Sequence, residues 1–166
     1  MNKNENNNLQ KLTIRPAVEQ DAPVLLSLVK ELAVFEKLAD RVINSEEAIR
    51  ETLFGEKTHV EAKIAYWEGE PAGMVIFFHN YSTFLGKPGL YIEDLFVREK
   101  FRGRGIGKAL FLECARLAKE RNCGRMEWVV LDWNPARVFY EKMGAYPLTE
   151  WVTYRMDEDA LQDINP

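Results

Sequence analysis

Three glycines, interleaved with basic and apolar residues, form the segment of this sequence best suited to binding phosphate. The segment reads Arg102-Gly103-Arg104-Gly105-Ile106-Gly107-Lys108. Glycine lets backbone N–H groups approach an anion because it has no Cβ atom in the way. A helix predicted to begin at Gly105 adds its unpaired N–H groups and the positive end of its dipole. We therefore predict that this positively charged segment binds a phosphate group.

The spacing excludes two common phosphate loops and leaves one alternative open. A Walker loop needs glycine at the position of Arg102, and Ser or Thr after Lys108, where the sequence has Ala109. The dinucleotide fingerprint G-x-G-x-x-G is not met, because the glycines follow a G-x-G-x-G spacing. Three glycines can also be no more than the turn that starts a helix. The basic residues and the strand predicted before the loop favour phosphate binding.

Two neighbouring acids, Glu93 and Asp94, interrupt the apolar strand predicted over residues 90–97, just before the loop. A positioned carboxylate can accept a proton from a reacting group, which is the role of a general base. Because successive strand residues point to opposite faces of a sheet, only one of the two is expected to face a cleft. The residues alone do not choose between them. An acid pair facing solvent at a sheet edge is the alternative.

Two further candidate positions combine aromatic and polar residues. Phe35 and Glu36 end a predicted helix, where an acid behind a ring could bind a primary ammonium by charge and ring face together. A solvated helix end is the alternative there. Asn134-Pro135 gives an N-cap and a first-turn proline for a short helix. Tyr140 lies about two turns into that helix, where it could equally belong to a core aromatic pair with Phe139.

The composition places these residues in one globular domain. The chain has 166 residues, of which 46% are apolar and 29% charged, values that suit a single self-sufficient core. Residues 1–10 are predicted to be a flexible tail, and 11–166 the domain. No apolar run approaches the roughly 20 residues of a membrane helix, and neither cysteine has a metal or C-x-x-C spacing. We expect a cytoplasmic protein without a metal ion.

The charge distribution argues against nucleic acid and membrane as partners. The net charge is −4, yet residues 98–108 contain five bases and one acid, so the rest of the chain sums to −8. An acidic protein has no general attraction for polyanions. One short basic segment in an acidic protein instead suits an anionic cofactor together with a cationic substrate.

The hydrophobic pattern gives the order of the elements that must position these residues. Strands are predicted at 12–15, 60–67, 72–80, 90–97, 126–131 and 151–156, and helices at 21–36, 44–55, 105–121 and 134–143. Asp21 and Asn44 are the predicted caps of the first two helices, and Gly124 is the predicted stop of the third. Residues 81–88 are predicted to form a loop. This order predicts a mixed α/β (α+β) domain.

The segment from Arg102 to Gly107 is similar to the R-x-x-G-x-G signature of the GNAT superfamily of acetyltransferases. The likeness extends from about Ile14 to Trp151 and is greatest to the spermidine/spermine group, within it to the thialysine N-ε-acetyltransferase branch. It rests on Lys30-Glu31-Leu32-Ala33-Val34-Phe35-Glu36-Lys37-Leu38, Tyr91-Ile92-Glu93-Asp94, Leu131-Asp132-Trp133-Asn134 and Phe139-Tyr140. The resemblance implies a GNAT fold, with a mixed twisted sheet of about seven strands that splays at an acetyl-CoA site, and about four helices.

The resemblance also implies roles for the candidate residues. Glu93 would bind the substrate and act as a base through water, and Tyr140 would protonate the leaving thiolate of coenzyme A. Phe35 and Glu36 would contact the amine. The residues expected to bind the cofactor are Leu95, Phe96, Val97, Arg102, Gly103, Arg104, Gly105, Ile106, Gly107, Lys108 and Asn134.

One departure from the polyamine enzymes bears on the substrate. Their loop before the catalytic strand has an acid and a Trp where this sequence has Ser82-Thr83-Phe84, so a partner for the far amine of a polyamine is missing. We therefore expect direct acetyl transfer to a primary amine of a small cationic molecule, such as a thialysine- or lysine-like amino acid or a diamine. A protein lysine or N-terminal acetyltransferase and a non-catalytic coenzyme A sensor are the alternatives. The resemblance further implies a homodimer.

Overall fold

The computed structural model describes residues 11–164, which form two compact units. The first unit ends at Val129 and the second begins at Val130. The predicted tail at residues 1–10 lies outside the described residues. The prediction of one domain over residues 11–166 stays a prediction.

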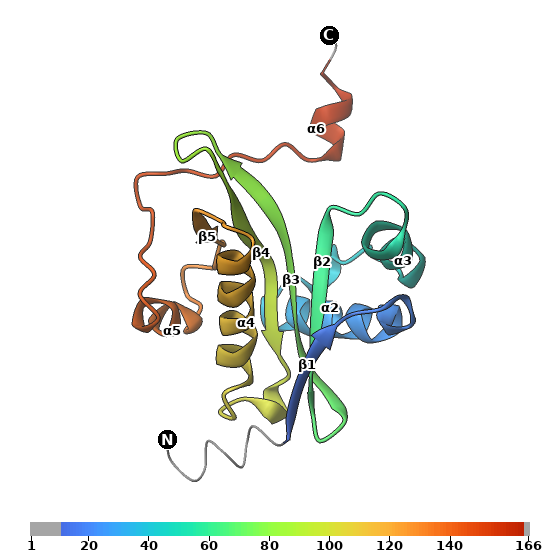
Figure 1. Ribbon diagram of the computed structural model, residues 1–166. Helices are drawn as coiled ribbons and strands as arrows, with labels where there is room; N and C mark the ends of the chain where they lie inside the picture. The colour runs from blue at the N-terminus through green and yellow to red at the C-terminus, as the bar shows by residue number, and fades with distance from the viewer. Residues whose placement is uncertain (1–10, 165–166) are drawn as a thin grey trace. The chain divides into compact units, whose positions relative to one another are not determined.

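The first unit is a five-stranded mixed sheet with helices on both faces (Figure 1). Its strands are β1 (Leu12–Pro16), β2 (Val60–Trp67), β3 (Glu70–Ser82), β4 (Lys87–Val97) and β5 (Arg125–Glu127), in that order across the sheet. Its helices are α2 (Ala22–Phe35), α3 (Glu46–Phe54) and α4 (Ile106–Glu120), with 3₁₀ turns η1 (Glu19–Asp21), η2 (Ala39–Arg41) and η3 (Glu99–Phe101). Neighbouring strands from β1 to β4 are antiparallel, and β5 runs parallel to β4.

Helices α2 and α3 cover one face of this sheet (Figure 1). Their buried side chains pack on residues that lie opposite one another on the central strands, namely Ile64 of β2, Met74 of β3 and Phe96 of β4. Leu25 and Leu28 of α2 are fully buried in this core. Each buried leucine contributes about 1.5–3 kcal/mol relative to an exposed one. The apolar face predicted for α2 is therefore what holds the helix on the sheet.

The starts of α2 and α3 differ from the predicted caps. The Asp21 side chain does not cap α2; its Oδ2 accepts from the Val18 N–H at 2.8 Å and pairs with Arg15 at 2.6 Å, which ties η1 to β1. The cap of α3 is shifted by one residue. Ser45, and not Asn44, accepts a hydrogen bond from the Ala48 N–H at 3.2 Å.

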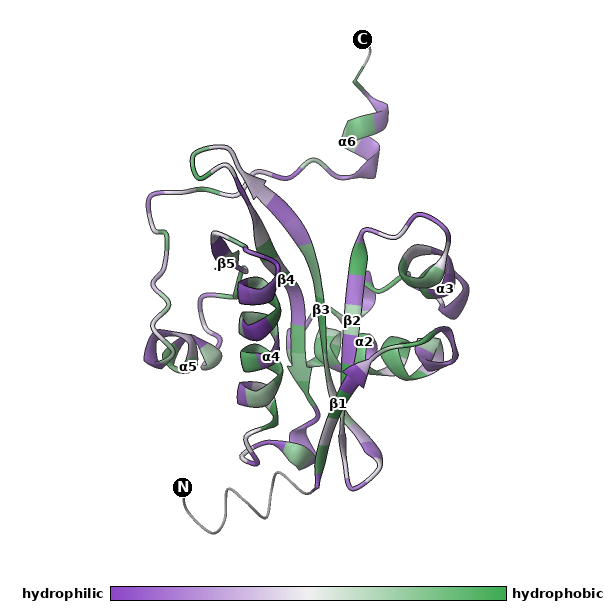
Figure 2. Ribbon diagram, viewed as in Figure 1, coloured by the Kyte–Doolittle hydropathy of each residue, from purple (hydrophilic) through white to green (hydrophobic). Residues whose placement is uncertain are grey.

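Helix α4 covers the opposite face of the sheet, and it has a hydrophobic and a hydrophilic side (Figure 2). The residues predicted for its apolar side are all buried, namely Ile106, Leu110, Cys114, Leu117 and Ala118. Its end differs from the prediction. The left-handed residue is Asn122, with φ of 54°, and the Cys123 N–H donates to the Ala118 carbonyl at 2.8 Å. Gly124 instead lies against Leu85, where a Cβ atom would come within 2.8 Å of the Leu85 side chain.

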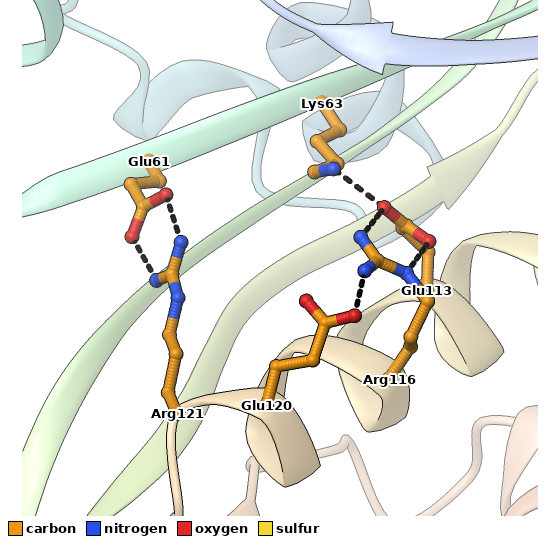
Figure 3. Close-up of polar contacts among 6 residues, drawn as sticks. All are labelled: Glu61, Lys63, Glu113, Arg116, Glu120 and Arg121. Atoms are coloured by element: carbon orange, nitrogen blue, oxygen red, sulfur yellow. Dashed lines mark hydrogen bonds and ion pairs between the residues drawn. The ribbon is translucent and has the colours of Figure 1, made fainter.

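Ion pairs fasten α4 to β2 on this face (Figure 3). Lys63 of β2 bonds to Glu113 of α4 at 2.5 Å, and Arg116 holds both oxygens of Glu113. Further along the helix, the Arg121 guanidinium forms a two-pronged pair with Glu61 of β2. Because α4 begins at the predicted phosphate segment, these pairs help to set the direction of the helix that presents it.

The second unit contains α5 (Ala136–Lys142) and α6 (Glu158–Gln162). Gly144 ends α5 as predicted, with φ of 91°. The strand predicted at residues 151–156 is wrong, because this segment forms no strand in the structure. A strand needs a neighbour to complete its hydrogen bonds, and alternating residues give only a local preference.

The counts of elements also differ from the expectation. The strand predicted at 126–131 is reduced to the three residues of β5. The described residues therefore hold five strands instead of about seven, and five α-helices instead of about four. The predicted mixed α/β class is confirmed. No helix among residues 11–164 combines the length and apolar character needed to cross a membrane.

Candidate active site

The predicted phosphate segment lies between η3 and the first turn of α4. Gly103 and Gly105 have left-handed backbones, with φ of 75° and 82°, and a Cβ atom at either would meet no atom of residues 11–164 within 4 Å. The first bond of the helix runs from the Ala109 N–H to the Gly105 carbonyl at 2.9 Å. The N–H groups of the first turn therefore have no partner within the helix. Open space beside such donors is what an anion site at a helix N-terminus needs.

The two arginines of this loop lie on aromatic rings. The Arg102 guanidinium is 4.6 Å from the centre of the Phe35 ring, and its Nε donates to the Val97 carbonyl at 3.1 Å. The Arg104 guanidinium is 5.1 Å from the centre of the Trp67 ring. Arg102 thus brings the phosphate loop into contact with Phe35, which the sequence analysis assigned to the amine.

Strand β4 separates from β5 next to this loop. The two strands pair only from Gly89 to Tyr91, whereas β4 continues to Val97. Within the first unit, residues 92–97 of β4 thus have a strand neighbour on the β3 side only. We call this stretch the open edge of β4; it corresponds to the predicted splay. A Cβ atom at Gly107 would lie 3.7 Å from Val97 and 3.9 Å from Leu95, so the open edge adjoins the first turn of α4.

The predicted cofactor-binding residues thus lie in the first unit, apart from Asn134. The side chain of Phe96 is buried in the core beneath α2 and α3, so only its backbone remains for a ligand. Asn134 belongs to the second unit. Lys108 lies in the first turn of α4, as predicted.

A β-bulge sets the positions of the two acids of β4. Ile76 and Phe77 are neighbours on β3, but they pair with Asp94 and Ile92, so Glu93 is an extra residue. Regular alternation, from which we expected only one of the two acids to face a cleft, therefore fails at this point. Ile76 packs on the core beneath α2 and α3, so its partner Asp94 belongs to the α2 face of the sheet.

Asp94 lies within electrostatic reach of Glu93 and Glu36, and we call these three carboxylates the acidic group. Burial, together with the charges of Glu93 and Glu36, raises the pKa of Asp94 to about 6. Burial also raises the pKa of Glu36. None of the ion pairs in the described part of the chain includes a member of this group. Carboxylates with raised pKa values and no cationic partner are typical of functional sites.

Glu36 and Glu93 were predicted site residues, whereas Asp94 was the acid of the pair to which the resemblance assigned no role. Asp94 gains its position from the bulge, which depends on the pairing of β3 with β4. The sequence marked Asp94 only as an acidic residue within an apolar strand. Among residues 11–164, no group of three or more His, Cys, Asp and Glu side chains is placed to hold a metal ion.

The end of α2 places Phe35 and Glu36. The Glu36 N–H donates to the Leu32 carbonyl at 2.9 Å, and Lys37 then takes a left-handed backbone, with φ of 62°. This turn ends the helix with the Phe35 ring under Arg102 and the Glu36 carboxylate within electrostatic reach of Asp94. One helix end therefore adjoins both the phosphate loop and the acidic group.

The second unit holds Asn134 and Tyr140. The Asn134 Oδ1 accepts from the Ala136 N–H at 2.9 Å at the start of α5, although the N-cap position falls on Pro135 and not, as predicted, on Asn134. The Tyr140 ring lies 5.3 Å from the Phe139 ring, centre to centre. Burial raises the pKa of the Tyr140 hydroxyl, so the group stays protonated to higher pH, as a proton donor must. Its action on a thiolate stays a prediction.

The segment before β4 is a tight hairpin turn and not the loop predicted over residues 81–88, because β3 and β4 continue to Ser82 and from Lys87. Ser82 is buried, and its Oγ accepts from the Leu85 N–H at 3.3 Å. Phe84, near the tip, is exposed. The Ser82 hydroxyl therefore stabilises the hairpin turn.

An open strand edge beside a glycine-rich helix start, with an acidic group formed by that strand and the end of α2, suits transfer between an anionic and a cationic molecule. A model of the Acetyltransferase (GNAT) family matches residues 28–145, a range that includes these features and Tyr140. The chain therefore belongs to the GNAT family and is an N-acetyltransferase, as its sequence signature predicted.

Its relatives include enzymes named for the amines they acetylate. The thialysine N-epsilon-acetyltransferase of Caenorhabditis elegans is 38% identical, over 93% of this chain and 95% of that protein. The L-ornithine N5-acetyltransferase of Arabidopsis thaliana is 32% identical, over 92% of this chain and 87% of that protein.

Solved structures support the fold. An integron cassette protein from the mobile metagenome of V. cholerae is 25% identical, with a TM-score of 0.77 over 92% of this chain and 96% of that one. An aminoglycoside acetyltransferase from an uncultured soil metagenomic sample, solved with trehalose, has a TM-score of 0.73 over 89% and 98% of the two chains. It is 17% identical, so this likeness concerns the fold alone.

Proposed function

We propose that this enzyme transfers the acetyl group of acetyl-CoA to a primary amine of a small cationic molecule, by direct attack in a ternary complex. The observation that supports this most is the acidic group on β4 and α2, next to a phosphate loop on the same unit. A cation site beside an anion site matches the charges of the two reactants.

The first unit fits acetyl-CoA as the acetyl donor. The unpaired N–H groups at the start of α4 suit its pyrophosphate, and Arg102 and Lys108 add positive charge. The open edge of β4 at Leu95 and Val97 offers backbone groups to the amides of its pantetheine arm. Bound there, acetyl-CoA would supply the acetyl group as a reactive thioester.

The acidic group would bind the ammonium and remove its proton. An alkylamine with a pKa of about 10.4 is neutral only about once in 2,500 molecules at pH 7, so a base is needed. Glu93 is the base that we propose, acting through water. Asp94, with its pKa of about 6, is ionised at neutral pH and holds a proton more readily than an ordinary aspartate. Glu36 adds a charge-assisted bond to the ammonium.

Tyr140 is the acid that we propose for the second proton transfer. A thiol has a pKa of about 8.5, so its thiolate departs best when it is protonated. The raised pKa of Tyr140 keeps its proton available for this step. Asn134 would add a contact to coenzyme A beside its hydrogen bond at the start of α5.

An amino acid with a side-chain amine is the substrate class that we favour. The two relatives above are named for thialysine and L-ornithine, which both belong to this class. The buried hydroxyl of Ser82 offers no charge to the far end of a long polyamine. Both observations support a short amine over spermine.

We also propose a homodimer located in the cytoplasm. Trp151, Val152 and Tyr154 of the second unit are exposed, and an apolar exposed run is typical of a surface that binds another protein. The two cysteines are free thiols, which suits a reducing compartment. Sedimentation analysis should give the mass of two chains; one chain's mass would contradict the dimer.

A thiol-release assay with acetyl-CoA tests the proposed activity. The panel consists of thialysine, lysine, ornithine, putrescine, spermidine, spermine and a lysine peptide. We expect the highest kcat/KM for the amino acids. A preference for spermine would overturn our interpretation of Ser82, and a preference for the peptide would indicate a protein acetyltransferase. Coenzyme A binding without thiol release from any amine would indicate a sensor.

A further inference from the structure

Arg98, the residue after β4, joins three parts of the first unit. Its Nε and Nη2 donate to the Glu31 carboxylate of α2 at 2.7–3.1 Å, and Nη2 also donates to the Ser27 hydroxyl at 3.0 Å. Its Nη1 donates to the Pro71 carbonyl of β3 at 2.9 Å. Ser27 in turn donates to Glu31 at 3.0 Å, which closes the network. One side chain thus ties the end of β4 to α2 and to β3.

The backbone after Arg98 connects it rigidly to the predicted phosphate segment. The Arg98 carbonyl accepts from the Phe101 N–H at 2.9 Å, and Arg102 N–H donates to the Glu99 carbonyl at 3.1 Å. The Phe101 ring between them is buried. These bonds form the single 3₁₀ turn η3, a compact connection with little freedom to stretch. The place of Arg102 is therefore set by that of Arg98.

A second arginine contacts α2 one helical turn beyond the contact made by Arg98. Arg102 lies on the Phe35 ring, and Arg98 bonds to Glu31. Residues 31 and 35 are four apart, so they lie on the same side of α2. Two arginines of the connection thus bind one side of the helix that ends at Glu36.

We propose that Arg98 is a positioning residue, which fixes helix α2 relative to the phosphate loop and so aligns the amine with the acetyl donor. The proposal rests on the proposed function, since Phe35 and Glu36 on α2 are assigned to the amine and the loop to acetyl-CoA. Arg98 itself touches neither reactant. Small displacements of reacting groups are costly, because a shift of about 1 Å can lower a rate about 100-fold.

A simple surface ion pair would look different. The Arg98 side chain is only 17% exposed and has three partners, whereas Lys100 beside it is 59% exposed and pairs with Glu70 alone among the described acids. Exposed single pairs contribute little to stability. A planar guanidinium with partners on several edges fixes direction as well as distance, and lysine could not replace it.

The test compares Arg98→Gln, Arg98→Lys and Glu31→Gln with Arg121→Gln, which breaks the pair with Glu61 at the other end of α4. Coenzyme A binding is measured by calorimetry, and kcat and KM by thiol release. We expect the Arg98 and Glu31 variants to raise the Kd for coenzyme A and the KM for the amine about tenfold, and to lower kcat. Arg121→Gln should change each by less than about twofold.

A double-mutant cycle separates positioning from general stability. If Arg98 acts through Glu31, the double variant Arg98→Gln with Glu31→Gln should bind coenzyme A no worse than Arg98→Gln alone. Additive losses in the double variant would overturn the proposal. It would also be overturned if Glu31→Gln left both the Kd for coenzyme A and the KM for the amine unchanged. The melting temperatures of Glu31→Gln and Arg121→Gln should be equal in that comparison, so that the two variants are equally stable. If the unmodified enzyme bound no coenzyme A, the proposed function itself would fail.

Discussion

Two carboxylates on opposite faces of the sheet, Glu113 on the α4 face and Asp94 on the α2 face, have opposite surroundings. On the α4 face, Glu61 and Glu113 are paired with basic side chains of α4 (Figure 3). The hydrogen bonds from Arg116 and Lys63 lower the pKa of Glu113 to about 2, and Arg121 lowers that of Glu61. On the α2 face, burial and mutual repulsion raise the pKa of Asp94 to about 6.

This difference separates carboxylates whose charge stabilises the fold from carboxylates whose charge destabilises it. A paired carboxylate with a lowered pKa adds stability at neutral pH, while a buried one with a raised pKa reduces it. Proteins tolerate the second kind mainly where a ligand or a reaction needs it. The contrast between Glu113 and Asp94 therefore supports the proposed site beside Asp94 on the α2 face, and four experiments can break or sharpen it.

The largest expected effect follows from removing the acids of β4. The double variant Glu93→Gln with Asp94→Asn should lower kcat/KM for the preferred amine about 10³-fold, because the proposed base and two of the three charges of the acidic group are lost. The matched control on the α4 face is Glu113→Gln, which should stay within about threefold of the unmodified enzyme. Equal losses in both would remove the distinction between the faces.

Tyr140→Phe should lower kcat about 100-fold by deleting the proposed acid. Coenzyme A should still bind, since the ring remains in place. The test is kcat by thiol release across pH 6–9 with Kd by calorimetry. A kcat unchanged over that range would show that the acid lies elsewhere, and the acidic group would then have to account for both proton transfers.

Glu36→Gln should raise the KM for the amine about tenfold and leave kcat nearly unchanged. The reason is that a charge-assisted bond to the ammonium is lost equally from the bound amine and from the transition state. Steady-state kinetics with ornithine and thialysine would measure this. A fall in kcat at constant KM would instead place Glu36 in the chemical step.

The smallest effects concern stability, and they should have opposite signs on the two faces. Asp94 has a pKa of about 6 in the fold and 3.8 as an ordinary side chain, so its ionisation costs stability as pH rises through this range. Asp94→Asn should therefore raise the melting temperature at pH 7.5 by about 2–4 °C, with the gain disappearing near pH 4.

Glu113 has a pKa of about 2 in the fold and 4.5 as an ordinary side chain. Its stabilisation is complete above pH 4.5 and is lost as pH falls towards 2. Glu113→Gln should thus lower the melting temperature at pH 7.5 by about 2–4 °C, and the loss should shrink in acid. Shifts of the same sign for both variants, measured by scanning calorimetry, would refute the contrast.

The elements of the first unit were largely predictable because their signals are local. Helical spacing marked α2 and α4, and glycines at 103 and 105 marked the backbone conformation that the loop adopts. The family resemblance was also confirmed. It could be recognised from the sequence because the residues of the signature are contiguous. The strand predicted at 151–156 failed, because its residues lack the neighbours that a strand requires.

The acidic group and the Arg98 network could not be predicted from the sequence. Asp94 lies where it does because β3 and β4 pair with a bulge, and pairing register joins residues that are far apart in the chain. Arg98 and Glu31 are 67 residues apart. Their bond depends on how α2 packs on the sheet, and no local pattern encodes that packing.

The open edge of β4 has a consequence for handling the protein. A strand with unpaired backbone groups is a template on which another chain can add, and this is a common route to aggregation. The pantetheine arm proposed to lie along residues 92–97 would occupy those groups in place of a strand. Coenzyme A should then act as a solubilising agent, so that protein concentrated with it stays clear longer on warming than protein freed of it by dialysis.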